Sequence, residues 1–227
     1  FEKMFADFIG VCFEQIIHSM SKIPYMSGGK VKIPMVIKTA AGCIGSAAQH
    51  SQCLWATFAH FPGMYVVAPS NPYDYKGLLA ASIQSDNPII FIEHKSHMHK
   101  RVSNFILNEE VPEKRYITKI GKAKIVKEGS DLTIVTLSAQ VEYSLVVANK
   151  LQSNNIDIEV IDLISIVPMD IETICLSVSK TKRLLVIDED YLSFGLSGEI
   201  ITRLIDHLGI NHLKSLEFCY LAKYLFL

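Results

Sequence analysis

Hydrophobic positions along the first hundred residues follow two periods. From Phe5 to Met20 they recur at i, i+3 and i+4, which predicts an amphipathic helix with one apolar stripe. Asn71, Pro72 and Asp74 form a helix start, with a capping amide, a proline in the first turn and a carboxylate near the positive end. The predicted elements are helices at 5–20, 51–60 and 72–84, and strands at 34–37, 64–67 and 89–92.

This pattern fails between about residues 94 and 115, where charged residues and Pro112 replace it. A second alternating unit follows, with strands expected at 122–126, 132–137, 158–161 and 184–187 and helices at 141–151, 171–178 and 197–207. The run at 89–92 is too apolar to face water on either side, as expected in a parallel sheet. The chain is therefore predicted to be α/β, with two domains, each a mostly parallel sheet flanked by helices. Their expected bounds are 1–100 and 116–227, joined by a linker at 101–115.

Composition narrows the class of protein. Hydrophobic residues make up 49% of the 227 residues, which favours an oligomer with buried faces. The net charge of −1 provides no electrostatic attraction for nucleic acid or an anionic membrane. No apolar run reaches the ~18 residues of a membrane span, and we expect no signal peptide. The chain does not begin with Met, which suggests a fragment or a processed chain. Its five cysteines form no CxxC, so reduced thiols are expected, in the cytoplasm or in a mitochondrial matrix or plastid stroma.

His50 is the strongest candidate for chemistry. It lies in Ala-Ala-Gln-His-Ser-Gln-Cys, residues 47–53, between two amides and a hydroxyl. An imidazole ionises near neutral pH, so it can act as an acid, a base or a hydrogen-bond donor to substrate. The alternative is a loop histidine whose hydrogen bonds are satisfied by backbone groups.

Two other clusters carry weaker hypotheses. His94, His97 and His99 suggest a metal-dependent hydrolase, although neighbouring Lys95 and Lys100 disfavour a bound cation. The acidic run 188–190 follows a predicted strand, where we expect a solvated turn. Cys53 is expected to be a buried thiol.

An ordered set of short segments resembles one family, the beta subunits of the thiamine-diphosphate-dependent first component of 2-oxoacid dehydrogenase complexes. Within that family the chain is most similar to the pyruvate and acetoin dehydrogenase type. The order and spacing of the segments hold over about 200 of the 227 residues. They are residues 4–8, 25–29, 47–53, 60–63, 69–74, 76–79, 87–95, 121–123, 159–163, 168–170 and 177–181.

The resemblance implies a fold and a shared site. Residues 1–100 would be the later part of a pyrimidine-binding domain, and the rest a transketolase C-terminal-like domain. Thiamine diphosphate would lie between this chain and an alpha subunit that holds the diphosphate and magnesium. Phe8 would pack on the aminopyrimidine, and His50 would assist acyl transfer to a lipoyl group. Ser82, Ile83 and Asn87 match a loop that binds potassium in some relatives.

The resemblance also implies partners, and some positions of the chain depart from the family pattern. Two alpha and two beta subunits would form a heterotetramer that uses a 2-oxoacid or acetoin and docks on a lipoyl-bearing acyltransferase core. The family glutamate that activates the cofactor would lie about twenty residues before Phe1. Ser85 replaces a family aspartate, Ile164 a family arginine and Lys182 a family glycine. As given, the polypeptide is expected not to activate the cofactor, and a non-catalytic scaffold subunit is the alternative function.

Overall fold

The computed structural model describes residues 2–220, and their strands form two five-stranded sheets. The first sheet has the order β1-β2-β4-β3-β8 and the second β10-β9-β6-β7-β5. All pairs are parallel except β3 with β8 and β5 with β7. The α/β class and the two mostly parallel sheets are therefore confirmed.

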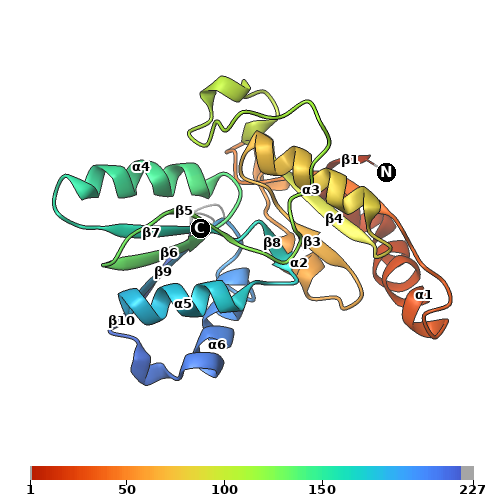
Figure 1. Ribbon diagram of the computed structural model, residues 1–227. Helices are drawn as coiled ribbons and strands as arrows, with labels where there is room; N and C mark the ends of the chain where they lie inside the picture. The colour runs from red at the N-terminus through yellow and green to blue at the C-terminus, as the bar shows by residue number, and fades with distance from the viewer. Residues whose placement is uncertain (1, 221–227) are drawn as a thin grey trace.

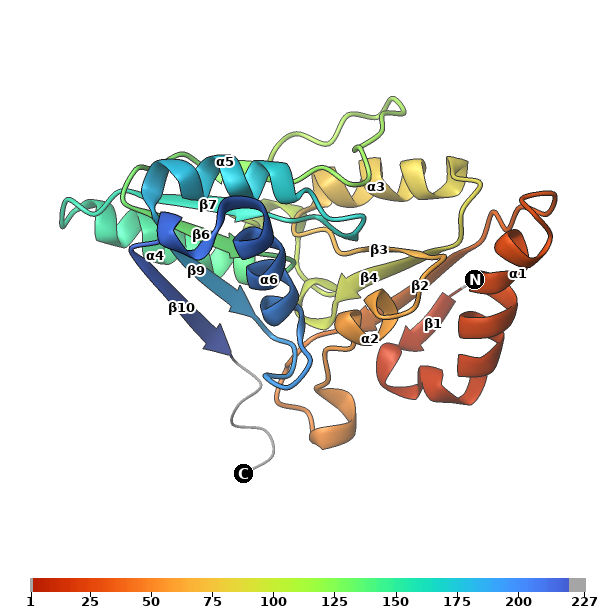
Figure 2. The same cartoon turned by 90° about the horizontal axis from the view of Figure 1, so that it is seen from below.

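Helices cover both faces of each sheet (Figures 1 and 2). In the first sheet, α3 lies on one face, and α2 and the N-terminal helical segments lie on the other. In the second sheet, α4 lies on one face, opposite α5 and α6. The first-half elements are β1 (Glu2–Phe5), η1 (Ala6–Cys12), η2 (Gln15–Met20), α1 (Ser21–Met26), β2 (Val36–Ala41), η3 (Ala48–His50), α2 (Trp55–Ala59), β3 (Tyr65–Val67), α3 (Pro72–Gln84) and β4 (Ile89–His94).

The second half contributes the other sheet and one strand of the first. Its elements are η4 (Lys95–His97), η5 (Val102–Asn104), β5 (Lys124–Lys127), β6 (Leu132–Thr136), α4 (Gln140–Gln152), β7 (Ile158–Asp162), β8 (Ser165–Val167), α5 (Ile171–Thr181), β9 (Arg183–Asp188), α6 (Leu196–Leu208), η6 (Ile210–His212) and β10 (Ser215–Tyr220). Among the described residues, no helix has both the length and the apolar character needed to cross a bilayer.

The predicted single helix at 5–20 is wrong at its start. Residues 2–5 pair in parallel with β2, so Phe5 ends a strand. The chain then winds through a 3-10 segment and a π segment before α1. Ile9, Ile16 and Met20 face the core as the stripe predicts, whereas the Phe8 side chain is 43% exposed.

The predicted helix at 51–60 is also too long, because α2 begins only at Trp55. Tertiary hydrogen bonds hold the preceding residues in a turn. The Ser46 amide donates to the Ser51 hydroxyl at 2.8 Å, and the Gln52 amide donates to Asp7 at 3.1 Å. These contacts accompany a turn that places residues 46–52 outside α2.

The largest of three hydrophobic clusters among the described residues joins the two halves. A single buried cluster includes Ile90 and Ile92 of β4 together with Val135 and Leu184 of the second sheet. β8 returns from the second half and pairs antiparallel with β3. This continuity places the end of β9 beside the loop that carries His50.

Candidate active site

The His50 loop leaves the end of β2 and is mostly exposed. Ala47 has a positive φ of 58°, after which η3 brings His50 back towards the first sheet. The half-buried imidazole contacts the edges of two aromatic rings, with centroids 5.8 Å from Phe5 and 5.4 Å from Phe8. Its Nδ1 is buried and has no hydrogen-bond partner among the described residues. Apolar contacts hold the imidazole ring, and its Nδ1 can therefore bond to a polar atom of a ligand.

A buried ion pair supports this loop from below. The Lys95 ammonium lies 2.5 Å from the Asp7 carboxylate, and both side chains are almost fully buried. Lys95 also donates to the His50 carbonyl at 2.9 Å, while Asp7 accepts from the Gln52 amide. The pair therefore fixes the backbone on both sides of Ser51.

His94 and Glu189 form a second buried pair at the base of the loop. The Ser96 amide donates to Nδ1 of His94, so Nε2 carries the proton and donates to Glu189 at 2.7 Å. The other Glu189 oxygen accepts from Gln140 at 2.9 Å. A β-carbon at Gly42 would overlap the His94 ring, and φ there is +122°, so glycine is required for this approach.

The acidic run 188–190 was expected to be a solvated turn, and this prediction is wrong. Asp188, Glu189 and Asp190 are each at most 3% exposed. Asp188 accepts from the Trp55 indole at 3.1 Å, and Asp190 accepts from the Ala56 amide at 3.0 Å. Asp188 is the last residue of β9, Glu189 and Asp190 follow it, and the packing of the two halves buries Asp188 and Asp190 against α2.

Burial changes the ionisation of this run. Desolvation raises the pKa of Asp188 to about 7, with a further contribution from neighbouring Asp190. It raises the pKa of Asp190 to about 6, against the opposing effect of two backbone hydrogen bonds. Both carboxyl groups thus ionise near neutral pH.

The other predicted histidines do not converge on a centre. His97 contacts the Phe105 ring at 4.9 Å, and desolvation lowers its pKa to about 3. His97 is therefore neutral, and its 3.9 Å approach to Glu142 is not an ion pair. His99 is exposed. Within residues 2–220, no group of three or more His, Cys, Asp or Glu side chains is arranged to hold a metal ion.

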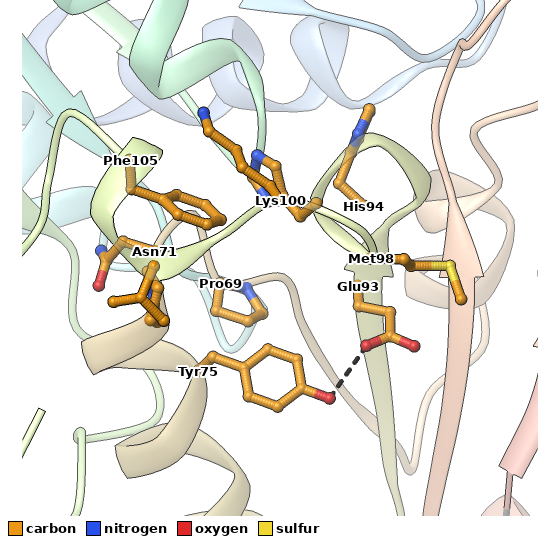
Figure 3. A pocket seen from close by; sticks show the side chains of 11 residues that line it. Pro69, Asn71, Tyr75, Glu93, His94, Met98, Lys100 and Phe105 are labelled. Carbon is orange, nitrogen blue, oxygen red and sulfur yellow. Dashed lines mark hydrogen bonds between the residues drawn. The ribbon is translucent and has the colours of Figure 1, made fainter.

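A small pocket of about 250 Å³ lies beside this segment (Figure 3). Its lining includes His94, Lys100 and Phe105, and the Tyr75 hydroxyl points towards Glu93, to which it donates at 3.0 Å. The ammonium of Lys100 lies 4.5 Å from the Phe105 ring centroid. The same ammonium forms an ion pair with Glu142.

Of the three predicted potassium ligands, Ser82 and Ile83 lie in the last turn of α3, and Asn87 lies in the loop that follows. The Ser82 hydroxyl is buried and donates to the Leu78 carbonyl at 2.8 Å. Ile83 is 65% exposed, and the Asn87 amide donates to the Ser85 hydroxyl at 3.1 Å. Lys32 forms an exposed ion pair with Asp86 in the same loop.

Comparisons with known proteins agree with the fold and with the motifs. Residues 1–100 match the family described as transketolase, pyrimidine binding domain, and residues 121–216 match transketolase, C-terminal domain. A solved split-gene transketolase, described as an inactive beta4 tetramer, superposes with a TM-score of 0.75 at 21% identity. That alignment covers 96% of this chain and 65% of the other.

Curated relatives are similar at higher identity. The beta subunit of acetoin:2,6-dichlorophenolindophenol oxidoreductase from Cupriavidus necator is 44% identical over 83% of this chain and 54% of its own length. The beta subunit of the pyruvate dehydrogenase E1 component from Rickettsia felis is 43% identical over 88% of this chain and 59% of its own length. The chain thus spans a little over half the length of these relatives.

Two transketolase domains in this order define the class of protein. The chain belongs to the transketolase-like family, and its curated relatives are named as beta subunits of an acetoin oxidoreductase and of a pyruvate dehydrogenase E1 component.

Proposed function

We propose that this chain is the beta subunit of a thiamine-diphosphate-dependent dehydrogenase. The enzyme would decarboxylate a 2-oxoacid such as pyruvate, or cleave acetoin, and transfer the acyl group to a lipoyl domain. The observation that carries the proposal is the pairing of the exposed Phe8 ring with His50, whose buried Nδ1 has no hydrogen-bond partner within residues 2–220. Relatives named as beta subunits of an acetoin oxidoreductase and of a pyruvate dehydrogenase E1 component support it.

The residues present fit an aromatic cofactor. The Phe8 side chain is 43% exposed and offers a flat apolar surface to a heteroaromatic ring. When bound, thiamine diphosphate supplies the carbanion chemistry, and the protein orients the reacting groups. The sequence has no Gly-Asp-Gly segment of the kind that anchors a magnesium diphosphate. By the family resemblance, we assign the diphosphate and magnesium to an alpha subunit.

His50 would hold or transfer a proton during acyl transfer. Its carbonyl is fixed by Lys95, and its ring is restrained by Phe5 and Phe8. This fixes the direction of the nitrogens without occupying Nδ1. A positioned imidazole contributes roughly 10²–10⁴-fold to a proton-transfer step. The contacts on Lys95 and Asp7 make them positioning residues rather than catalytic ones.

The proposal includes an assembly and a compartment. Two alpha and two beta subunits would form a heterotetramer on a lipoyl-bearing acyltransferase core, in the cytoplasm or in a matrix or stroma. The two domains would be residues 1–100 and 116–227, with 101–115 between them. Carbonyls of the loop at Ser82, Ile83 and Asn87 would bind a potassium ion.

The test is to co-express the complete gene product with its alpha partner and to measure dye reduction with pyruvate, acetoin and a branched 2-oxoacid. We expect turnover with one of these, dependent on added thiamine diphosphate and magnesium. An assembled complex that binds an acyltransferase core but turns over none of the three would instead support a non-catalytic scaffold subunit. Ile164, in place of the family arginine, motivates that second function.

A further inference from the structure

Two thiols face each other across the base of the His50 loop. The Sγ atoms of Cys43 and Cys53 lie 3.9 Å apart. The backbone brings the two ends of this loop together, since the Gly42 amide donates to the Gln52 carbonyl at 3.1 Å. The nine residues between the two cysteines include His50.

The surroundings of the two thiols differ. Cys53 is 2% exposed, and desolvation raises the pKa of its thiol. Cys43 is half-buried and lines an open depression of about 660 Å³ together with His94, Gln140 and Glu189. A small solute can therefore reach Cys43 directly, whereas Cys53 is reached only through Cys43 or from within the core.

Glu189 contacts both thiols. The Cys43 thiol donates to the Glu189 carbonyl at 3.5 Å, and the Cys53 thiol donates to its carboxylate at 3.9 Å. A carboxylate at this position can accept the proton that Cys53 must lose before it acts as a nucleophile.

We propose that Cys43 and Cys53 are an oxidisable pair that forms an intrachain disulfide in response to a peroxide and closes the loop carrying His50. Hydrogen peroxide oxidises the Cys43 thiol to a sulfenic acid and releases one water. The Cys53 sulfur then attacks the Cys43 sulfur, its proton passes through Glu189, and the hydroxyl leaves as a second water. Two thiols thus lose two electrons and two protons, and the peroxide is reduced to two waters.

The geometry requires a modest movement. A disulfide needs its sulfur atoms about 2 Å apart, so the Sγ atoms must approach by roughly 2 Å. Residues 44–49 are exposed and can adjust, while Gly42 and Gln52 keep the loop ends together. Oxidation would also remove both thiol donors from Glu189. The pairing does not depend on the proposed enzymatic function.

The test is peptide mapping of the complete protein in its assembled form. Hydrogen peroxide is added in stoichiometric steps, free thiols are alkylated in denaturant, and the five cysteines of this chain are followed individually. We expect alkylation to fall from five cysteines to three, with a linked peptide joining Cys43 to Cys53. A dithiol reductant should restore all five.

Two variants make the result decisive. Cys43→Ser should keep all four remaining cysteines alkylated, whereas the matched control Cys175→Ser should fall from four to two. The proposal is overturned if Cys43 is oxidised to an irreversible sulfinic acid while Cys53 stays free. It is equally overturned if the linked peptide is absent when Cys12 or Cys175 has already been oxidised.

Discussion

Lys182 shows the effect of a single residue on the end of a helix. It follows α5 in the left-handed region, with φ of 61°, and its amide donates to the Val178 carbonyl at 2.8 Å. By the family resemblance, relatives have glycine at this position. A side chain in this region costs about 1–2 kcal/mol, and glycine loses about 0.5–1 kcal/mol more backbone freedom on folding.

Lys182→Gly is therefore predicted to stabilise the chain by about 0.5–1 kcal/mol. For a chain of this size each kcal/mol shifts the melting temperature by about 2–4 °C. Thermal unfolding of the purified chain measures this shift in melting temperature. Lys182→Ala retains a β-carbon and serves as the control. An equal gain from alanine would show that the lysine side chain, rather than the backbone conformation, is unfavourable.

At the scale of elements, the His50 loop is held by contacts distant in sequence. Asp7 comes from η1 and Lys95 from η4, and together they bind the backbone at residues 50 and 52. Because both side chains are buried, removing one leaves the other as an uncompensated charge. Such a loss typically costs about 3–5 kcal/mol.

We predict that Lys95→Met lowers the free energy of unfolding, measured in urea, by about 3–5 kcal/mol. The double variant Asp7→Asn with Lys95→Met should lose less free energy of unfolding than the two single variants lose in sum. Lys32→Met breaks the exposed ion pair with Asp86 and should cost less than about 1 kcal/mol. Equal costs for the buried and the exposed pair would contradict the assigned role of Lys95.

Elements with local determinants were predicted best from the sequence. The helix at 72–84 matches α3, and the Asn71 side chain accepts from the Asp74 amide as its cap requires. The prediction of a helix at 51–60 was wrong at its start, because the contacts that hold residues 46–52, such as the bond from the Gln52 amide to Asp7, cannot be inferred from local sequence. The strand β8 was missed because it has three residues and pairs with a strand about 100 residues earlier.

At the scale of the whole molecule, the run 188–190 joins the two halves. Asp188 and Asp190 accept hydrogen bonds from Trp55 and Ala56 of α2, and Glu189 bonds to His94 at the end of β4. The sequence indicated His50 and Phe8 as neighbours only through the resemblance. It could not reveal this network, since burial of three consecutive acids depends on how the two halves pack.

The network predicts a pH dependence of stability. An unfolded aspartate ionises near pH 4, whereas the pKa of folded Asp188 is about 7. Between these values the folded state binds the additional proton. The stabilising contribution of Asp188 is therefore fully present below about pH 4 and is lost as the pH rises through 7.

Asp188→Asn cannot ionise and keeps the shape of the protonated acid. Between pH 5 and 7 we predict that its free energy of unfolding rises relative to wild type by up to about 1.4 kcal/mol per pH unit. Urea unfolding across this range measures the difference, with the exposed Asp206→Asn as control. Parallel curves for Asp188→Asn and wild type would show that Asp188 is ionised when folded.

We propose that His50 acts in acyl transfer within a site shared with an alpha subunit. The most direct measurement is the single-turnover rate of reductive acylation of a lipoyl domain by the assembled complex. We predict that His50→Ala lowers this rate by about 10²–10⁴-fold. The exposed His99→Ala, in a complex assembled in the same way, should stay close to wild type. An unchanged rate for His50→Ala in an intact complex would contradict the claim.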